Sequence, residues 1–489
     1  MRLGHKLKRY VALGLRWFAG GWRNRPNAGA RRVAPVVQSN LREVAHLAWP
    51  IATAMLGETL MGLVDTKLVG GLGAAALGGV GLATMLMYLN YAVVFGLMRG
   101  VKVRTAHAVG EGRGADALRY AQAGVMSGFV LGVGVYFFGR DASWALRALH
   151  VDPATIPYAR DFLAARTCGA PAICMISALV QSRQGRGDTR TPMVIGLAGN
   201  VVNAALAYAL IYGRWGFPAL GVRGAGYATA TVEALCASAY LVLLARDAKR
   251  DKPSISLGRA LREVCDLGVP TGVHLGLETL AFTAFTALLG SMGAEQIAAH
   301  QVAMAVVRVS FLPGLALSEA ASVLVGRALG ARRLDDADRV TRGAIVLAVT
   351  YMTFCGVVFA VAGPWIGRGF THDPSVVHVV RQLLLVAALF QALDAVTMVL
   401  RGALRGAKDV RMVMLIGTSV AWVCVPGAAF VLGRLAGLGA LGGWCGFVLE
   451  TGASAVLFWR RWNRGSWRAA YGSTPVEPTP VPSAALASA

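Results

Sequence analysis

The chain has 489 residues, of which 56% are hydrophobic and only 15% are charged, and its mean hydropathy is +0.55. Soluble domains carry about a quarter charged residues, so this composition excludes an ordinary soluble globular protein and favours a lipid bilayer as the surroundings. The net charge of +23 would suggest a nucleic-acid partner in a soluble protein. Here the charges lie between apolar runs, so we interpret them as a topology signal and expect no nucleic-acid partner.

The termini and the cysteines add limits of their own. Met1–Val33 is rich in Arg but lacks a compact apolar core followed by a cleavage site, so it does not resemble a signal peptide. Within it, Lys8–Trp22 mixes Trp and Arg and favours an amphipathic helix on the membrane surface. Ser473–Ala489 is predicted to be disordered. The seven cysteines form no CxxC pair, so neither a disulfide framework nor a zinc site is expected.

Apolar segments recur along the whole chain. A helix needs about 20 apolar residues to cross about 30 Å of hydrocarbon, and backbone groups in lipid must be satisfied within the segment. We therefore predict an all-α membrane protein with about 12 transmembrane helices. They are placed at residues 44–65, 77–99, 117–139, 160–182, 192–213, 221–245, 264–289, 296–322, 341–365, 380–403, 411–433 and 439–460.

Lys and Arg gather in the connections that follow the even-numbered helices. Examples are Lys102 and Arg104 after the second helix, and Arg332 and Arg333 after the eighth. The odd-numbered connections are short or poor in these residues. Because basic loops stay on the cytoplasmic side, we predict a multi-pass protein of the inner (plasma) membrane with both termini in the cytoplasm.

An internal repeat divides the chain. Leu41-Arg42-Glu43-Val44 recurs as Leu261-Arg262-Glu263-Val264, and Glu58-Thr59-Leu60 recurs as Glu278-Thr279-Leu280, an offset of 220 residues. Units of six helices have the same orientation in the membrane, so their symmetry axis runs along the membrane normal. Such parallel repeats occur in secondary transporters, with the substrate site between the halves.

The repeat and the composition together predict four segments. These are a basic cytoplasmic N-terminal segment (1–43), an N-lobe with helices 1–6 (44–250), a C-lobe with helices 7–12 (251–460) and a disordered cytoplasmic tail (461–489).

Four motifs resemble those of the MATE (multidrug and toxic compound extrusion) family. They are the Asp65-Thr66 end of the first helix, the opening of the sixth helix at Gly221–Thr229, Ala299-His300-Gln301-Val302 in the eighth helix, and Leu404–Asp409 after the tenth. The resemblance runs from about residue 41 to 460 and implies two six-helix lobes. It further implies an antiporter that exports small organic, cationic and amphipathic compounds in exchange for inward protons or sodium, without a cofactor and as a monomer.

Four acids lie within the predicted spans: Glu58, Asp65, Glu278 and Asp394. Ionisable groups inside a membrane are expensive and usually functional. Glu58 and Asp65 are seven residues apart, so they share a helix face about 10 Å apart. An apolar site disfavours the charged form of a carboxylate, which allows it to take up and release a proton. The resemblance assigns cation coupling to Asp65.

The resemblance also relates Glu278 and Asp394 to the acids that bind the cation in the sodium-coupled branch of the family. That branch often has Tyr where this chain has Phe390. The missing oxygen weakens the case for sodium, and the choice between proton and sodium stays open.

Further polar residues are candidates for the wall of the substrate cavity. Arg308 is expected to face the interior and either pair with an acid such as Asp394 or Glu278, or bind an anionic part of the substrate. Glu319, eleven residues later, is expected on the same face, and its role stays open. For several of these residues, helix packing is the competing interpretation. The predicted cavity residues are Asn200, Asn203, His274, Gln301, Arg308 and Phe390.

Two other classes of function agree less well with the sequence. A lipid-linked oligosaccharide flippase of the related superfamily is the alternative: Arg308 favours it, whereas twelve helices and four intramembrane acids argue against it. A membrane enzyme is not expected, because the sequence contains no HExxH motif, no nucleophile elbow and no phosphate-binding loop.

Overall fold

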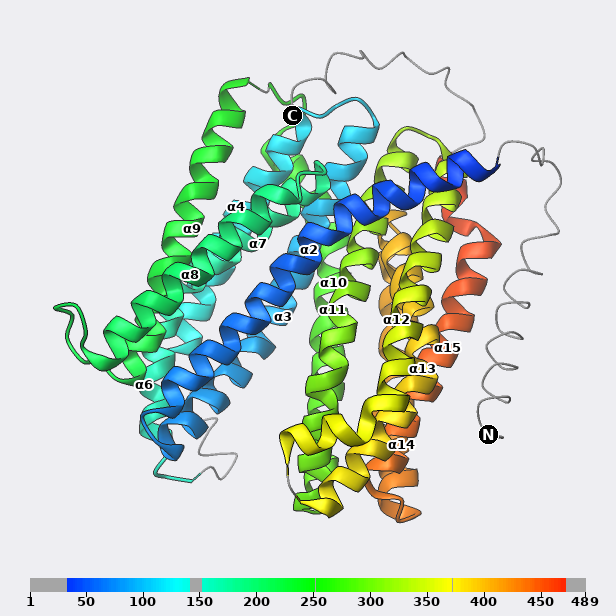
Figure 1. The fold of residues 1–489 in the computed structure, drawn as a ribbon. Helices are drawn as coiled ribbons and strands as arrows, with labels where there is room; N and C mark the ends of the chain where they lie inside the picture. The colour runs from blue at the N-terminus through cyan, green and yellow to red at the C-terminus, as the bar shows by residue number, and fades with distance from the viewer. Residues whose placement is uncertain (1–32, 141–151, 251, 372, 472–489) are drawn as a thin grey trace. The chain divides into compact units, whose positions relative to one another are not determined.

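The computed structural model describes residues 33–140, 152–250, 252–371 and 373–471, and twelve helices in these ranges are long and apolar enough to cross a membrane (Figure 1). The predicted all-α fold with twelve spans is confirmed. The N-lobe contains α2 (Val33–Gly70, apolar from Leu41), α3 (Ala74–Gly110), α4 (Asp116–Gly139), α6 (Ile156–Arg166) joined through a 3-10 turn to α7 (Ala170–Gly185), α8 (Arg190–Tyr212) and α9 (Val222–Arg250).

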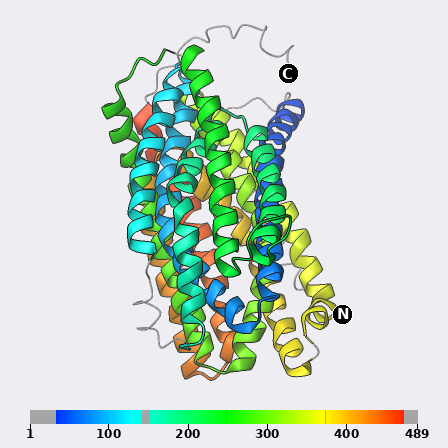
Figure 2. The ribbon, with the colours of Figure 1, turned by 90° about the vertical axis from the view of Figure 1, so that its left-hand side faces the viewer.

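The C-lobe contains the other six spans. They are α10 (Leu257–Gly290), α11 (Ala294–Gly330), α12 (Leu334–Phe370), α13 (Pro374–Gly406), α14 (Val410–Ala428) with a π-helical extension to Leu435, and α15 (Gly439–Arg464). A short 3-10 helix, η3 (Ser466–Tyr471), follows. Figure 2 turns the molecule so that the N-lobe helices face the viewer. The predicted surface helix at Lys8–Trp22 and the tail from Ser473 lie outside the described residues.

Several helices are longer than the apolar segments that predicted them. The second was expected at 77–99 but extends over Ala74–Gly110, because the polar residues after the apolar run remain helical and pack against the other lobe. This extension brings the basic residues of the even-numbered connections onto the helix ends. We call the end of the bundle with connections 111–115, 186–189, 252–256, 331–333 and 407–409 the basic end.

The repeat is visible in the backbone as well as in the sequence. Gly73 and Gly293, which precede α3 and α11, have φ values of 105° and 129°. The turns after these helices contain Gly112 at φ 75° and Arg332 at φ 56°. Both pairs are 220 residues apart, and left-handed backbone is strained for residues with a Cβ. The two lobes therefore turn at equivalent points, although only one of them uses glycine at the second turn.

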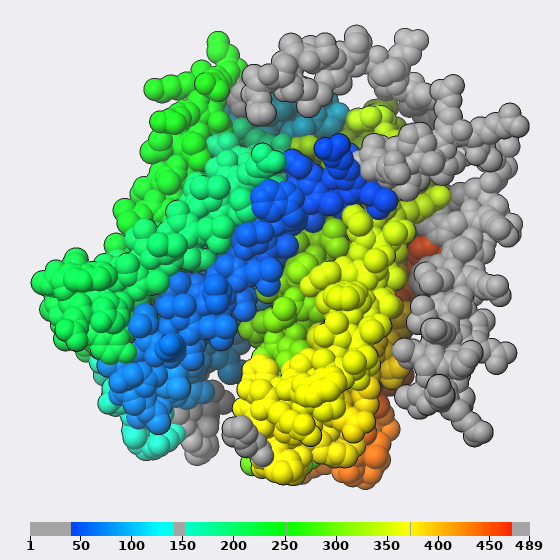
Figure 3. Space-filling view, in the orientation of Figure 1, coloured from blue at the N-terminus to red at the C-terminus, as the bar shows by residue number. Residues whose placement is uncertain are grey.

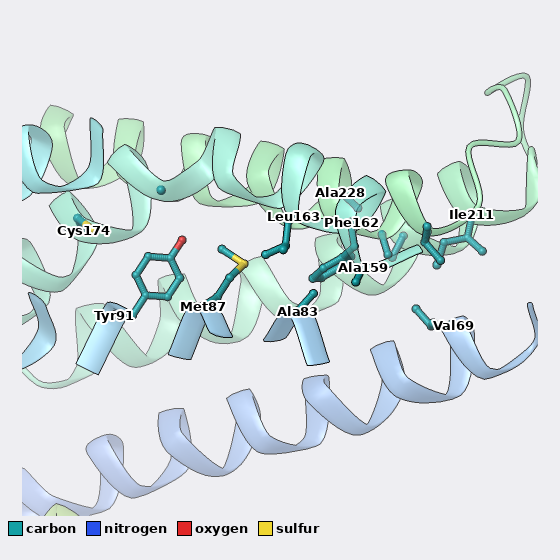
Figure 4. Close-up of a cluster of buried hydrophobic side chains, with 14 of the residues drawn as sticks. Val69, Ala83, Met87, Tyr91, Ala159, Phe162, Leu163, Cys174, Ile211 and Ala228 are labelled. Atoms are coloured by element: carbon teal, nitrogen blue, oxygen red, sulfur yellow. The ribbon is translucent and has the colours of Figure 1, made fainter. Parts of the chain in front are cut away.

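Each lobe has an apolar core of its own. In the N-lobe, Ala83 and Met87 of α3 lie beside Phe162 and Leu163 of α6, and Tyr91 of α3 lies in the same cluster on the side of Cys174 of α7 (Figure 4). The C-lobe core is aromatic: Phe285, Phe390, Trp444 and Phe447 lie together, with ring centroids 5.0–6.5 Å apart.

The lobes meet mainly through α3, which packs against α10 and α11. Gly96 and Gly100 of α3 lie against Gly272 and Gly268 of α10 so closely that a Cβ at any of them would collide with the opposite backbone. The contact lies in the half of the helices nearer the basic end. Figure 3 shows α2 from Leu41 onward (blue) between the green helices of the N-lobe and the yellow helices of the C-lobe.

Candidate functional site

The N-lobe candidate site joins α2 to α8. Asn203 of α8 is buried, and its Nδ2 donates to both carboxylate oxygens of Asp65, at 3.3 and 3.5 Å. Asp65 has no ion pair with any described residue. The Oδ1 atom of Asn203 is buried and has no hydrogen bond within the described part of the chain. Asn200 lies one turn earlier, and its amide faces α2 at Gly57.

A second polar pair crosses the same lobe. Arg166 at the end of α6 donates to both oxygens of Glu233 in α9, at 2.7 and 2.5 Å, and Glu233 is 8% exposed. The buried hydroxyl of Tyr91 on α3 has no hydrogen bond to a described residue and points away from α3 (Figure 4). Sequence reasoning missed this pair, although charged residues in two apolar segments were a signal that could have found it.

Glu58 differs from Asp65 in its surroundings. Its side chain is exposed at the surface of the described chain and makes no ion pair or hydrogen bond there. Asp65, two turns later, is half-buried. The two acids on α2 therefore do not form a pair.

In the C-lobe, Glu278 is held by a cation. Arg401 of α13 donates to Glu278 at 2.8 Å and lies 3.6 Å from Glu450 of α15. The Nε2 atom of His274 lies 3.7 Å from Glu278, and its Nδ1 is 3.2 Å from the hydroxyl of Thr418. His274 and Glu278 are one turn apart on α10, which brings these two side chains together. Sequence reasoning singled out neither Arg401 nor Glu450.

Asp394 lies on the same helix as Arg401, seven residues earlier, and is half-buried. It makes no hydrogen bond or ion pair with a described residue. The described residues also contain no group of three or more His, Cys, Asp or Glu side chains placed to hold a metal ion. Arg401 contacts Glu278, and Phe390, four residues before Asp394, has no side-chain oxygen.

The prediction that Arg308 pairs with Asp394 or Glu278 is wrong. Arg308 is exposed and makes no ion pair with the described residues, and Arg401 takes the place proposed for it. Glu319, by contrast, is 5% exposed and forms ion pairs with Arg99, at 3.2 Å, and Lys102 of α3. The two positions on α11 differ because α3 covers the helix at Glu319.

The remaining predicted cavity residues separate into two groups. Gln301 is exposed on α11. Phe390 is 5% exposed and lies in the aromatic core against Trp444 and Phe447, so it does not line a cavity. The neighbour of Gln301 in the same motif, His300, accepts a hydrogen bond from Trp444 Nε1 at 3.2 Å and is structural.

Polar contacts join the lobes at the basic end. Glu263 of α10 accepts a hydrogen bond from Tyr120 of α4 at 2.6 Å and lies 3.5 Å from Arg104 of α3. His107 of α3 donates to the carbonyl of Gly406 at 2.8 Å. These contacts, together with the glycines of α3 and α10, close the basic end in this conformation.

The family model described as MatE matches residues 50–209 and 270–430. The chain belongs to the MatE family. The matched segments begin 220 residues apart (270 − 50), which is the spacing of the internal repeat. Membership in this family, with twelve candidate spans, makes the chain a multi-pass membrane protein.

Curated relatives cover most of the chain. It is 30% identical to a probable multidrug resistance protein NorM of Geobacillus kaustophilus, over 87% of this chain and 96% of the relative. It is 28% identical to the multidrug resistance protein MdtK of Yersinia enterocolitica, over 85% of this chain and 93% of the relative.

Solved structures agree in fold. The eukaryotic MATE transporter AtDTX14 superposes with a TM-score of 0.79 at 19% identity, over 88% of this chain and 97% of that structure. An outward-facing conformation of a multidrug resistance MATE family transporter gives a TM-score of 0.80 at 21% identity, over 89% and 97%.

Proposed function

We propose that this protein is a secondary active exporter of small organic cations, that it exchanges them for protons, and that Asp65 is the group that binds the proton. Membership in the MatE family and relatives named multidrug resistance proteins support export of organic compounds. The observation that carries the choice of Asp65 is its partner: it accepts hydrogen bonds from a neutral amide and contacts no cation among the described residues.

Three other acids are less suited to this role. Glu233 is paired with Arg166, Glu278 with Arg401, and Glu319 with Arg99 and Lys102. Contact with a guanidinium or ammonium favours the ionised form of a carboxylate. An acid that must take up and release a proton in each cycle works better without such a partner.

Asn203 offers a partner to Asp65 in both protonation states. The ionised carboxylate accepts from Nδ2, as in this structure. A protonated Asp65 would donate to Oδ1, which is buried without a hydrogen bond to a described residue. Because the two states need different atoms of one amide, protonation changes how α2 and α8 fit together.

Exchange follows from competition for the same charge. A cationic substrate is attracted by the ionised Asp65, and a proton removes that attraction. A ligand shifts a conformational equilibrium only by its differential affinity for the two states, and a coupling of 1–3 kcal/mol is typical. With its basic end closed, this conformation suits proton entry and substrate release at the opposite end. We propose that the basic end faces the cytoplasm, since basic loops stay on that side.

A transport assay in inverted membrane vesicles tests the proposal. Ethidium uptake should be driven by a proton gradient, abolished by an uncoupler and independent of sodium. Asp65→Asn should lower the initial rate by at least about tenfold, a loss of about 1.4 kcal/mol. Asp335→Asn, an exposed acid at the basic end, is the matched control and should transport normally.

Three results would contradict the proposal. Normal, uncoupler-sensitive transport by Asp65→Asn would move the proton site elsewhere. A strict sodium requirement together with loss of activity in Asp394→Asn would place coupling in the C-lobe. Failure of the wild-type protein to move any cationic dye would remove the organic-cation proposal, and lipid-linked oligosaccharide flipping would be tested next.

A further inference from the structure

A small cavity lies between the lobes near the basic end, where α3, α10, α11 and α13 meet. The charged side chains that line it are Arg99 and Lys102 of α3, Glu319 of α11 and Arg405 of α13. Thr271 and Ser322 contribute hydroxyl groups. We call it the inter-lobe cavity. It is separate from Asp65, which lies on α2 and contacts α8.

The charges in this cavity do not balance. Three cationic side chains face one carboxylate, and that carboxylate, Glu319, is already in contact with Arg99 at 3.2 Å and with Lys102. Glu278, an acid of α10 outside the lining, is paired with Arg401 at 2.8 Å. The lining therefore has three basic side chains and a single carboxylate.

Arg405 is the side chain that most needs a partner. It is 6% exposed, lines the cavity, and makes no hydrogen bond or ion pair with any residue that the structure describes. Its Nε atom is buried without an acceptor. An unpaired buried charge is strongly destabilising, so a partner of negative charge would stabilise this arrangement.

The size of the cavity limits the ligand. It has room for about one water-sized species, which is too little for a phosphate or an organic carboxylate. The hydroxyl of Ser322 makes no hydrogen bond to a described residue and is free to donate. We propose that the inter-lobe cavity binds a chloride-sized inorganic anion between Arg405, Arg99 and Lys102.

The site is divided between the lobes. Arg99 and Lys102 come from the N-lobe, whereas Ser322 and Arg405 come from the C-lobe. All four approach one another only when the lobes meet at the basic end. A bound anion therefore stabilises the conformation that is closed at this end, by binding it in preference to a conformation in which the lobes have parted. This role does not depend on which compound is exported.

Thermal unfolding of the full chain in detergent tests the proposal. Sodium chloride is exchanged stepwise for sodium gluconate at constant ionic strength. We expect chloride to raise the Tm of the wild-type protein saturably, by about 3 °C, and bromide to act in the same way. Arg405→Gln should abolish this increment. Arg405→Lys, which keeps the charge, should retain part of it, and Arg262→Gln, an exposed arginine on α10, should retain all of it.

A crystal grown in bromide locates the ion directly. An anomalous peak among Arg405, Arg99 and Lys102 supports the proposal, as does loss of that peak in Arg405→Gln. An equal chloride response in the wild type and Arg405→Gln, no saturable response in the wild type, or a bromide peak only at other positions would overturn it. If Arg405→Gln does not fold, Ser322→Ala replaces it, with a weaker chloride affinity as the expected result.

Discussion

Glu58 and Glu278 occupy equivalent positions in the two repeats, but their environments differ. Glu278 is in contact with Arg401, whereas Glu58 is exposed and contacts no cation among the described residues. The N-lobe has its buried ion pair elsewhere, between Arg166 and Glu233. Duplication has therefore preserved the helices and their turns while the charges have been redistributed. In each lobe one acid is fixed by an arginine and another, Asp65 or Asp394, is left without a cationic partner.

The largest expected effect separates the two equivalent glutamates. Glu278→Gln removes the closer of the two carboxylates beside the half-buried Arg401, so we expect a loss of about 3 kcal/mol in stability, the lower end for a broken buried pair. Glu58→Gln at the matched position should change stability by no more than about 0.5 kcal/mol. Thermal unfolding in detergent measures both. Similar losses of stability in the two variants would contradict the exposed, unpaired environment of Glu58.

The N-lobe ion pair should behave like a pair and not like two independent charges. Glu233→Gln leaves Arg166 without a partner and should cost about 3 kcal/mol. The double variant Arg166→Met, Glu233→Leu should recover most of that loss, because well-packed apolar residues can replace a buried ion pair. A double-mutant cycle on the unfolding free energy measures the coupling. Additive losses would contradict it.

A third experiment concerns the amide that contacts Asp65. Asn203→Leu removes both the donor and the free Oδ1 atom, so we expect about a tenfold drop in the transport rate, about 1.4 kcal/mol, and a shifted pH profile. Thr418→Val is the matched C-lobe change, because it removes the partner of His274, and it should leave the pH profile unchanged. An unaltered profile in Asn203→Leu would exclude the amide from coupling.

The smallest effect concerns equivalent turns at the basic end. Gly187 and Lys408 have φ values of 77° and 64°, so Lys408 has the strained backbone that Gly187 tolerates. Lys408→Gly should remove about 1 kcal/mol of strain, partly offset by loss of the contact between its Nζ and the Tyr471 ring, whose centroid is 5.9 Å away. A lower Tm at pH 7 would contradict this.

Lys408 also makes stability depend on pH. Burial, with a smaller contribution from Arg104, lowers the pKa of Lys408 from 10.5 to about 8. Between pH 8 and 10.5 the unfolded chain binds more protons at this residue, so its contribution to stability should rise with pH across that window. Comparing Lys408→Gln with Lys252→Gln, an exposed lysine, isolates this increment, which should disappear only in the former.

Hydropathy and the repeat predicted the twelve spans and the two lobes, because a helix must be long and apolar to cross a bilayer. Hydropathy also drew attention to Asp65, and the resemblance to the family drew attention to Asn203. They did not predict which residues pair. The partner of Glu278 is Arg401 on α13 and not Arg308 on α11. Which arginine pairs depends on how each helix is rotated about its axis and on which of its residues a neighbouring helix buries. Hydropathy and the repeat specify neither the rotation nor the buried residues. Arg166 and Glu233 were overlooked although the rule used for the other intramembrane acids applied to them.

The glycines between α3 and α10 bring one main chain directly against another. Glycine has no side chain, so nothing from Gly96, Gly100, Gly268 or Gly272 interdigitates with the opposite helix. The two helices can therefore separate here without withdrawing a side chain from between its neighbours. Separation at these four positions requires little rearrangement of rotamers. The resistance to it comes from the surrounding ion pairs and hydrogen bonds, whose groups water can solvate as the lobes move apart, and from the apolar cluster that includes Val101 of α3 and Val264 of α10. An added methyl group at Gly96 would keep the two main chains from meeting, and the basic end would then be held open before any substrate or proton had bound.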